Sequence, residues 1–192
     1  MFSVFREYLS GKIQLSDEDY KMIESVSIIK KMRKHQYLLQ EGDIWRYNVF
    51  VCQGLLRTYR VDDKGVEHII NFAMENWWIG DRESLASGNP SGFNIDALED
   101  SVVLLINKEN FEHLCKKLPA LNDLVHTIIN RSFIASQNRI NAFLSYTAEE
   151  KYRYFLDKYP GVALRVPQQM IASYLGMTPE TLSRIKRQIS KK

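Results

Sequence analysis

The side chains with the clearest chemical potential lie at the C-terminal end of the chain, in VPQQMIASYLGMTPETLSRIKRQISKK (residues 166–192). Apolar Leu182, Ile185 and Ile189 recur there at spacings of three and four, which predicts the buried stripe of a helix. The outer face of that helix would carry hydroxyl, guanidinium, amide and ammonium groups from Thr181, Arg184, Arg187, Gln188 and Lys191. From Arg184 onward there are five basic residues and no acidic one. Such a face can donate hydrogen bonds to phosphates and to base edges, so it predicts contact with DNA.

A second short helix precedes this one and would position it. Its apolar face is supplied by Ile171, Ala172 and Leu175. Gly176 can end that helix in the left-handed conformation, and Thr178 can cap the next one. Pro179 suits the first helical position, because the N–H that proline lacks has no partner there, and Glu180 follows in the first turn. This pattern predicts a helix-turn-helix. The alternative is a helical hairpin with a solvated basic tail.

Length, composition and charge narrow the classes of protein to which the chain can belong. The 192 residues are 45% hydrophobic, enough to form a core in one large or two small domains, and the net charge is only +3. The basic residues gather at the C-terminal end, and the rest of the chain is nearly neutral. We therefore expect the protein to contact phosphate groups through that one surface. Cys52 and Cys115 have no disulfide or metal spacing, so we expect reduced thiols. Neither a signal peptide nor a run long enough to span a bilayer is visible, so we expect a soluble, cytoplasmic protein.

Nothing in the sequence indicates an enzyme. It has no nucleophile–base constellation, no phosphate-binding loop and no metal-ligand spacing. Asp81 and Glu83 could be read as paired carboxylates, but two acids in a polar loop are expected to be solvated. The four histidines form no haem or metal pattern: His35, His68, His113 and His126. The sequence therefore predicts no catalytic residue, no metal and no certain cofactor.

Between residues 28 and 106, short β-rich runs alternate with turn signals at intervals near ten residues. This spacing predicts an antiparallel β-sandwich or roll. Residues 62–65 (DDKG) predict a hairpin turn, with Gly65 available for positive φ. The polar segment 79–96 breaks the regularity and predicts one helical turn at residues 82–86. A long irregular insert of this kind is functional or mobile, or else a plain surface excursion.

A long helix is predicted from about residue 120 to residue 145, after Pro119. One set of its residues falls near a seven-residue repeat: Leu121, Val125, Ile128, Ser132, Ala135, Arg139 and Ala142. A second face carries Ile129, Phe133, Ile140 and Leu144. Two apolar faces must both be buried, and small side chains in the first set would allow close helix approach, which suggests a parallel dimer. The alternative is packing within one chain. Further on, Thr147 restarts a helix and residues 162–167 predict a short strand or extended link.

This order of elements resembles the Crp/Fnr superfamily of transcription regulators, particularly those of Bacteroidetes-type bacteria. The resemblance covers nearly the whole chain and rests on FVCQGLLR (50–57), DKG (63–65), WIGD (78–81), ALEDS (97–101), TAEEK (147–151) and IASYLGMTPETLSR (171–184). It implies an α+β fold: an N-terminal antiparallel β-roll of the cyclic-nucleotide-binding type, a long dimerisation helix and a winged-helix-type helix-turn-helix. The expected domains are residues 1–118, 119–146 and 147–192. Because the chain stops soon after the recognition helix, we expect the wing to be reduced.

The resemblance implies that Glu180 and Arg184 contact base edges in the major groove of a palindromic operator. The chemistry agrees, because a carboxylate can accept from cytosine and a guanidinium can fork onto guanine. Pro179 stands where many members carry a basic residue, so the preferred site should differ from theirs. The full DNA-binding set expected is Gln168, Gln169, Thr178, Glu180, Thr181, Ser183, Arg184, Arg187 and Lys191. The implied partners are double-stranded DNA, a second copy through residues 120–145, and RNA polymerase.

The resemblance extends less well to cyclic nucleotide. The expected effector pocket comprises Gly80, Asp81, Glu83, Ser84, Ser91 and Asn94. The arginine that neutralises a cyclic phosphate in the family falls near Ser91, and no basic residue lies between Arg82 and Lys108. A buried phosphate would be poorly compensated there, so a response to cyclic AMP is disfavoured. The competing hypothesis is a cyclic-nucleotide-responsive regulator or sensor whose terminal helices bind a protein partner.

Overall fold

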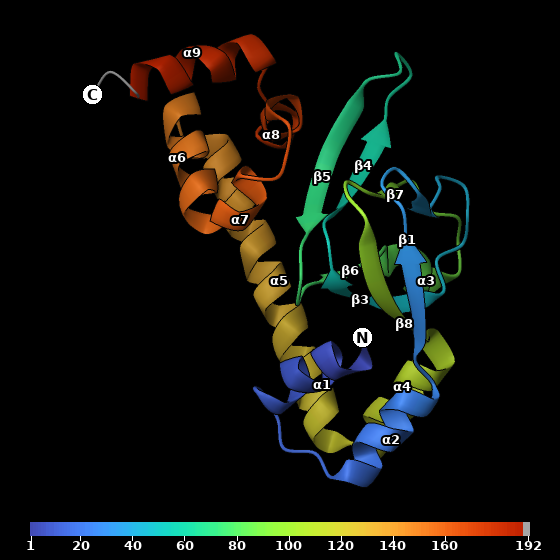
Figure 1. Ribbon diagram of the computed structural model, residues 1–192. Coiled ribbons are helices and arrows are strands. Elements are labelled where there is room, and N and C mark those ends of the chain that lie inside the picture. The colour runs from blue at the N-terminus through green and yellow to red at the C-terminus, as the bar shows by residue number, and fades with distance from the viewer. Residues whose placement is uncertain (190–192) are drawn as a thin grey trace.

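The N-terminal part of the chain folds into a roll of two antiparallel four-stranded sheets (Figure 1). The structure, a computed structural model, describes residues 1–189. Its strands are β1 (Ile28–Met32), β2 (Tyr37–Leu39), β3 (Tyr47–Gln53), β4 (Leu56–Val61), β5 (Glu67–Ala73), β6 (Trp78–Ile79), β7 (Asn94–Ala97) and β8 (Ser101–Asn107). One sheet has the order β1-β8-β3-β6 and the other β2-β7-β4-β5. The predicted β-roll is therefore confirmed.

Two local predictions within the roll are also confirmed. The β4–β5 hairpin turns at residues 62–66, where the Asp62 carboxylate accepts from the N–H groups of Lys64 and Val66 at 2.9 Å each. Gly65 has a φ of +78°, a backbone conformation that would be strained in a residue with a side chain. The predicted helical turn is α3 (Arg82–Ser87), which begins where the Asp81 carboxylate accepts from the first free N–H groups.

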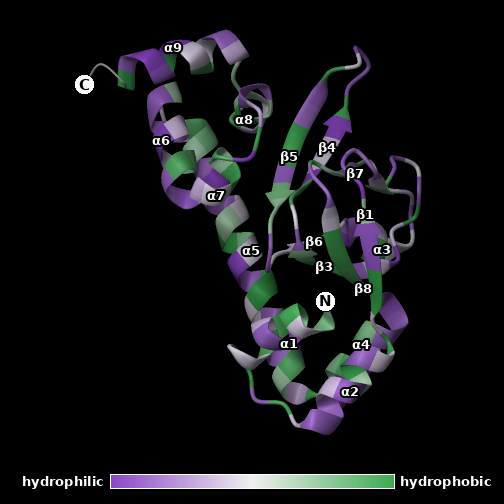
Figure 2. Cartoon of the chain, in the orientation of Figure 1, coloured by the Kyte–Doolittle hydropathy of each residue, from purple (hydrophilic) through white to green (hydrophobic). Residues whose placement is uncertain are grey.

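Strand β8 is buried on both faces, which explains its uninterrupted apolar sequence. Val103 and Leu105 point between the two sheets, whereas Leu104 and Ile106 point toward the helices that cover the outer face. Because successive side chains of a strand alternate, one run of apolar residues serves both layers. Figure 2 shows β8 in the green of hydrophobic residues over much of its length.

Four helices frame this layer: α1 (Phe2–Ser10), α2 (Asp17–Ser25), α4 (Lys108–Lys117) and α5 (Pro119–Ser145). The starts of α2 and α4 are capped by side chains. The Ser16 side chain and Asp19 form a capping box for α2, and the Asn107 side chain accepts from the Asn110 N–H at 2.8 Å. The 27 residues of α5 extend over about 40 Å, so this helix runs along the roll and beyond it (Figure 1).

The two faces of α5 are used differently from the sequence-based prediction. The seven-residue set does not form a free seam, because Ala142 is buried in the chain and Arg139 hydrogen-bonds to β5. The second set is the free one, with exposures of 62% for Phe133, 60% for Ile140 and 77% for Leu144. The difference arises because Leu121 at the start of the first set packs into the core with α1 and α4, and Arg139 near its end contacts β5 and α8, contacts that helical periodicity alone does not reveal.

The C-terminal part is helical throughout its described length. Its helices are α6 (Ala148–Lys158), α7 (Pro160–Ala163), α8 (Gln168–Tyr174) and α9 (Pro179–Ile189). The strand or extended link expected at residues 162–167 is wrong. Pro160 starts the short helix α7, and the N–H groups of Leu164 and Val166 donate to the carbonyls of Pro160 and Val162 at 3.3 and 3.1 Å, which is the bonding of a helical rather than an extended path. No wing strand occurs between residues 146 and 189.

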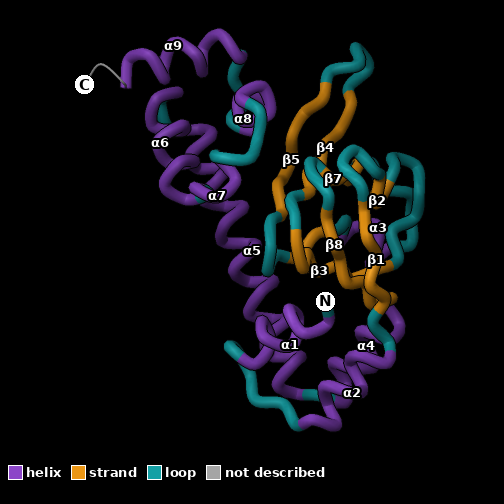
Figure 3. Tube along the Cα trace, in the orientation of Figure 1, coloured by secondary structure: helices purple, strands orange, loops and turns teal. Residues whose placement is uncertain are grey.

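The C-terminal helices pack against the β4–β5 side of the roll, where α8 lies beside β5 (Figure 3). A shared core joins Tyr59 and Phe72 of the roll to Phe155 and Tyr174 of the helices. Arg165 adds ion pairs to Glu75, at 2.8 Å, and to Glu99. Burial raises the pKa of the Glu75 carboxyl, but hydrogen bonds from Arg165 and from backbone N–H groups outweigh it and leave that pKa lowered.

Candidate nucleic-acid interface

The turn between α8 and α9 explains why a glycine stands at residue 176. The Met177 N–H donates to the Ala172 carbonyl at 3.0 Å, and the Gly176 N–H donates to the Ser173 carbonyl at 3.1 Å. These bonds form a Schellman motif, which places Gly176 in the left-handed region with a φ of +65°. A Cβ at Gly176 would also lie 2.5 Å from the ring of Phe143 on α5. Glycine therefore sets both the bend of the motif and its close approach to α5.

Helix α9 begins as the sequence predicts. The Thr178 hydroxyl accepts from the Thr181 N–H at 3.3 Å, and Pro179 occupies the first helical position. The pKa of the Glu180 carboxyl is lowered by a hydrogen bond from its own backbone N–H and by another from Thr178. Glu180 thus remains a carboxylate that can only accept hydrogen bonds.

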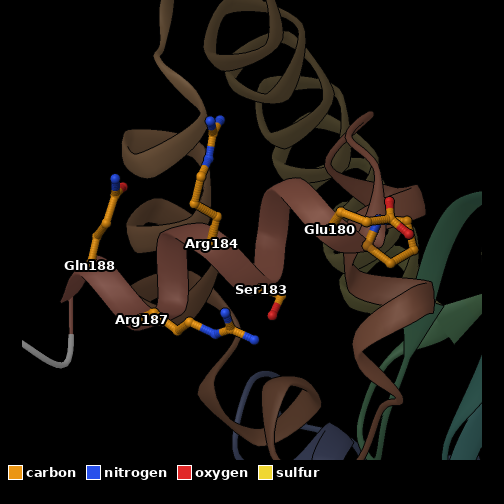
Figure 4. A pocket seen from close by; sticks show the side chains of 6 residues that line it. Glu180, Ser183, Arg184, Arg187 and Gln188 are labelled. Carbon is orange, nitrogen blue, oxygen red and sulfur yellow. The ribbon is translucent and has the colours of Figure 1, made fainter.

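The inner side of α9 is anchored by Leu182 and Ile185, which are 1% and 3% exposed. The opposite side is an open hollow of about 500 Å³ lined by Pro179, Glu180, Ser183, Arg184, Arg187 and Gln188. Figure 4 shows Arg184 and Gln188 extending to one side of α9 and Ser183 and Arg187 to the other. The helical period therefore separates one buried anchoring stripe from exposed donors and acceptors on two adjacent stripes.

The other predicted DNA-binding residues differ in how exposed their side chains are. Gln168 and Gln169 are exposed in the first turn of α8, beside N–H groups that have no partner within the helix. Thr178 is exposed, whereas Thr181 is half-buried with its hydroxyl 3.2 Å from that of Thr178. The outward position expected for Thr181 is therefore only partly available. Lys191 lies outside the described residues.

Most of the residues predicted to hold an effector are hydrogen-bonded within the roll, to one another or to neighbouring residues. Asp81 is 7% exposed, and its second carboxylate oxygen accepts from the Ser91 hydroxyl at 2.7 Å. The Ser84 hydroxyl accepts from the backbone N–H of Trp45 at 2.9 Å and donates to the Asn89 carbonyl at 2.6 Å. These side chains close the 79–96 segment onto the roll, so their hydrogen-bonding capacity serves the fold.

The remaining three predicted effector residues lie around this network. Asn94 accepts from the Glu41 N–H at 3.0 Å, and Glu83 is exposed. Gly80 has a φ of +154°, and a Cβ there would lie 2.6 Å from the indole nitrogen of Trp45. Its role is close packing rather than contact with a ligand.

A separate cavity of about 380 Å³ lies between the roll and α5. Gly80 and Asp81 reach its lining, whereas Glu83, Ser84, Ser91 and Asn94 do not. Much of the wall comes from residues that the sequence-based prediction omitted, including Trp78, Phe111, Ile128, Ser132, Phe133 and Ser136. The spacing of Ile128, Ser132 and Ser136 at four-residue intervals marks one helix face, but only the packing of α5 shows what that face covers.

Residues 1–189 contain neither a cluster of metal-ligand side chains nor a membrane-spanning helix. No group of three or more His, Cys, Asp or Glu side chains could hold a metal ion. No helix of this range has the length and apolar character that crossing a membrane requires. Cys52 and Cys115 are free thiols, the first buried and the second half-buried.

Comparison with known proteins agrees with this geometry. The pattern of the cyclic nucleotide-binding domain matches residues 29–118. The chain is 26% identical to regulatory protein HlyX of Actinobacillus pleuropneumoniae over 183 residues, covering 89% of this chain and 75% of HlyX. It is 25% identical over 183 residues to the fumarate and nitrate reduction regulatory protein of Escherichia coli (strain K12), covering 89% and 72%. The solved structure of FixK2 from Bradyrhizobium japonicum has a TM-score of 0.75 at 21% identity, covering 86% and 85%.

The fold and the exposed face of α9 define a class of protein: a DNA-binding transcription regulator with a sensor-type β-roll, a long connecting helix and a helix-turn-helix. The related proteins indicate the family within this class. The similarity to these proteins supports a Crp/Fnr superfamily regulator, as the expected resemblance implied. The closer assignment to the Bacteroidetes-type regulators stays a prediction.

Proposed function

We propose that the protein binds a palindromic DNA operator as a homodimer and inserts α9 into the major groove of each half-site. The observation that carries this proposal is the division of α9 into the buried stripe of Leu182 and Ile185 and the exposed stripes of Glu180, Arg184 and their neighbours. Arg184 would fork onto guanine O6 and N7, and Glu180 would accept from cytosine N4. Pro179 removes one basic contact, so the preferred sequence differs from that of members with a lysine or arginine there.

Phosphate contacts would fix the register of α9 on the duplex. Gln168 and Gln169 stand at the N-terminal end of α8, where free N–H groups and the helix dipole favour a phosphate. Thr178 occupies the equivalent position before α9, and Lys191 would extend the basic surface. These groups orient the protein without reading sequence.

The exposed apolar face of α5 supports a two-fold dimer. Phe133, Ile140, Phe143 and Leu144 are each more than half exposed, although large apolar side chains favour burial. A parallel pairing of two α5 helices would cover this face and hold two copies of α9 for the two halves of a palindrome. We therefore assign residues 119–146 to dimerisation, 1–118 to the sensor-type domain and 147–192 to the DNA-binding domain, in a protein that acts in the cytoplasm.

Regulation by cyclic AMP is not part of this proposal. Ser91 occupies the expected phosphate position and is bonded to Asp81, so a cyclic phosphate entering there would meet a buried carboxylate instead of a cation. Calorimetry with cyclic AMP and cyclic GMP should detect no micromolar binding. Micromolar binding would instead favour a cyclic-nucleotide-responsive regulator. We also propose no catalytic activity and leave RNA polymerase as a further candidate partner.

The decisive experiment is selection of operator DNA from a random library, followed by affinity measurements with two arginine variants. Arg184→Ala should weaken binding to the selected operator by about 1–3 kcal/mol and relax preference at one base pair. Arg153→Ala is the matched control, because Arg153 is an exposed arginine of α6 that pairs with Glu149 at 2.9 Å and does not line the α9 hollow. Its affinity should equal that of the parent protein.

Three results would contradict the proposal. If no DNA sequence is enriched, the helix-turn-helix serves another partner, for which a protein is the alternative. If the enriched site is a single half-site bound by one chain, the dimer is wrong. If Arg184→Ala and Arg153→Ala bind equally well, the assignment of α9 as the recognition helix fails.

A further inference from the structure

The free edge of strand β5 has an irregularity beside the DNA-binding helices. β5 is the last strand of its sheet and pairs with β4 alone. The register changes between Thr58 opposite Asn71 and Tyr59 opposite Ile69, which leaves Ile70 as an extra, bulged residue. An edge strand also leaves outward N–H and C=O groups without a strand partner. The edge of β5 therefore offers backbone groups to whatever packs against it.

Ser173 of α8 takes up part of this edge. Its hydroxyl accepts from the Ile69 N–H at 3.0 Å and donates to the Glu67 carbonyl at 3.0 Å. One side chain of the helix-turn-helix thus replaces the two bonds that a further strand would make. Because the Glu67 carbonyl and the Ile69 N–H are two residues apart on the strand, one hydroxyl can reach both, and these two bonds fix where Ser173 lies along β5.

Arg139 of α5 takes up the neighbouring part. Its guanidinium donates to the carbonyl of bulged Ile70 and lies 3.5 Å from the Ile69 carbonyl. The same guanidinium donates to the Tyr174 carbonyl at 3.3 Å and lies 4.0 Å from the centroid of the Tyr174 ring. The contact with α8 is at the C-terminal end of that helix, where the helix dipole favours a cation.

Arg139 therefore joins three parts of the molecule: the long helix, the sensor sheet and the helix-turn-helix. A guanidinium has five donors in a planar fork, which suits several carbonyls at once, whereas lysine is a single point of charge. The connection along the chain itself is slight, because Tyr146 separates α5 from the cap of α6 with extended dihedrals of −88° and 144°. Contacts across space must then determine how the helix-turn-helix sits on α5.

We propose that Arg139 and Ser173 are positioning residues that set the distance between the two recognition helices, and with it the half-site spacing that the protein accepts. This inference rests on the proposed two-fold dimer. In such a dimer α5 is fixed by its partner, so the angle of each helix-turn-helix to α5 determines the separation of the two copies of α9. Helix-turn-helix dimers require half-sites separated by about one turn of DNA. Loss of the contacts leaves the shared core and Arg165 to hold each helix-turn-helix, so its angle to α5 is less sharply set and operators with altered spacing become acceptable.

The test is a selection from DNA in which two copies of the parent protein's half-site are separated by random spacers of different length. The variants are Arg139→Gln, Arg139→Lys and Ser173→Ala, with Arg153→Gln as the control. The parent protein and the control should enrich one spacing. Arg139→Gln should lower the preference for that spacing over its neighbours by about tenfold, the effect of losing one charged hydrogen bond. The spacing preference of Arg139→Lys should lie between those of the parent protein and Arg139→Gln, because lysine retains the charge but lacks the planar set of donors.

Two companion measurements separate positioning from general stability. Affinity for a single half-site and the melting temperature should be close to the parent values in Arg139→Gln, while the spacing preference falls. An unchanged spacing preference would overturn the inference. So would an equal loss of affinity for every spacing together with a lower melting temperature, since that is the result of a purely structural role. If the parent protein itself enriches no paired half-sites, the proposed dimeric function fails and the inference with it.

Discussion

The buried ion pair in the roll yields the sharpest quantitative prediction, for the substitution Asp96→Asn. Arg57 and Asp96 have side chains only 7% and 5% exposed, and two hydrogen bonds of 2.8 and 3.0 Å join them. Burial lowers the pKa of Arg57, but the bonds to Asp96 and Glu67 outweigh it and raise that pKa. Removal of the Asp96 charge leaves a buried guanidinium whose remaining ion-pair partner is Glu67, with a side chain that is 46% exposed.

Breaking a buried pair costs about 3–5 kcal/mol, and the remaining contact with Glu67 places Asp96→Asn near the lower end, at about 3 kcal/mol. Urea unfolding followed by tryptophan fluorescence suits the measurement, because all three tryptophans lie in the roll, at positions 45, 77 and 78. Glu67→Gln is the control and should cost about 1 kcal/mol or less, because exposed pairs contribute little.

The double variant Arg57→Met/Asp96→Leu tests the reason for this effect. If the cost comes from an unpaired buried charge, removal of both charges should restore most of the stability that Asp96→Asn loses. A loss below about 1 kcal/mol in Asp96→Asn would refute the argument, because it would mean that water reaches Arg57. A double variant less stable than Asp96→Asn would show that the ion pair itself, rather than its disruption, dominates.

Three other outcomes are expected. Gly54→Ala should destabilise the roll by about 2 kcal/mol or more, measured by the same unfolding assay, because φ is +97° and the new Cβ would lie 2.7 Å from the Ser101 Cα. Glu75 has a lowered pKa, so its contribution is present above its unfolded pKa and is lost as pH falls through the folded value. From about pH 5 to about pH 3, the parent protein should therefore lose more unfolding free energy than Glu75→Gln, and equal losses would contradict this. Leu144→Glu should raise the dimer dissociation constant at least about tenfold in sedimentation equilibrium, whereas Leu164→Glu, at an 89% exposed position outside α5, should not.

The candidate interface was largely predictable because its signals are local. Thr178, Pro179 and Gly176 act through the backbone within a few residues, so their types already indicate a cap, a helix start and a turn. The exposed position of Arg184 follows from the same helical period that buries Leu182. A pattern of this range depends little on the rest of the fold.

The effector region was less predictable, because its residues act across the chain. Ser91 and Asp81 are ten residues apart, and their bond depends on how the loop closes over α3. The cavity draws its walls from strands, α4 and α5 together, so no continuous stretch of sequence marks it. The expected strand at residues 162–167 failed because the backbone there bonds to itself, with the Val166 N–H donating to the Val162 carbonyl at 3.1 Å, and has no strand partner.

The sequence by itself determined the succession of β-roll, long helix and C-terminal helices, the start of α6 at Thr147, and the helix-turn-helix with its polar outer face. These features depend on hydrogen bonds and side-chain periods that span a few residues. Only the tertiary structure decided which face of α5 is left free, and that Arg139 joins β5 to α8. Such choices depend on packing between elements far apart in the chain, where each surface is buried or exposed according to what meets it.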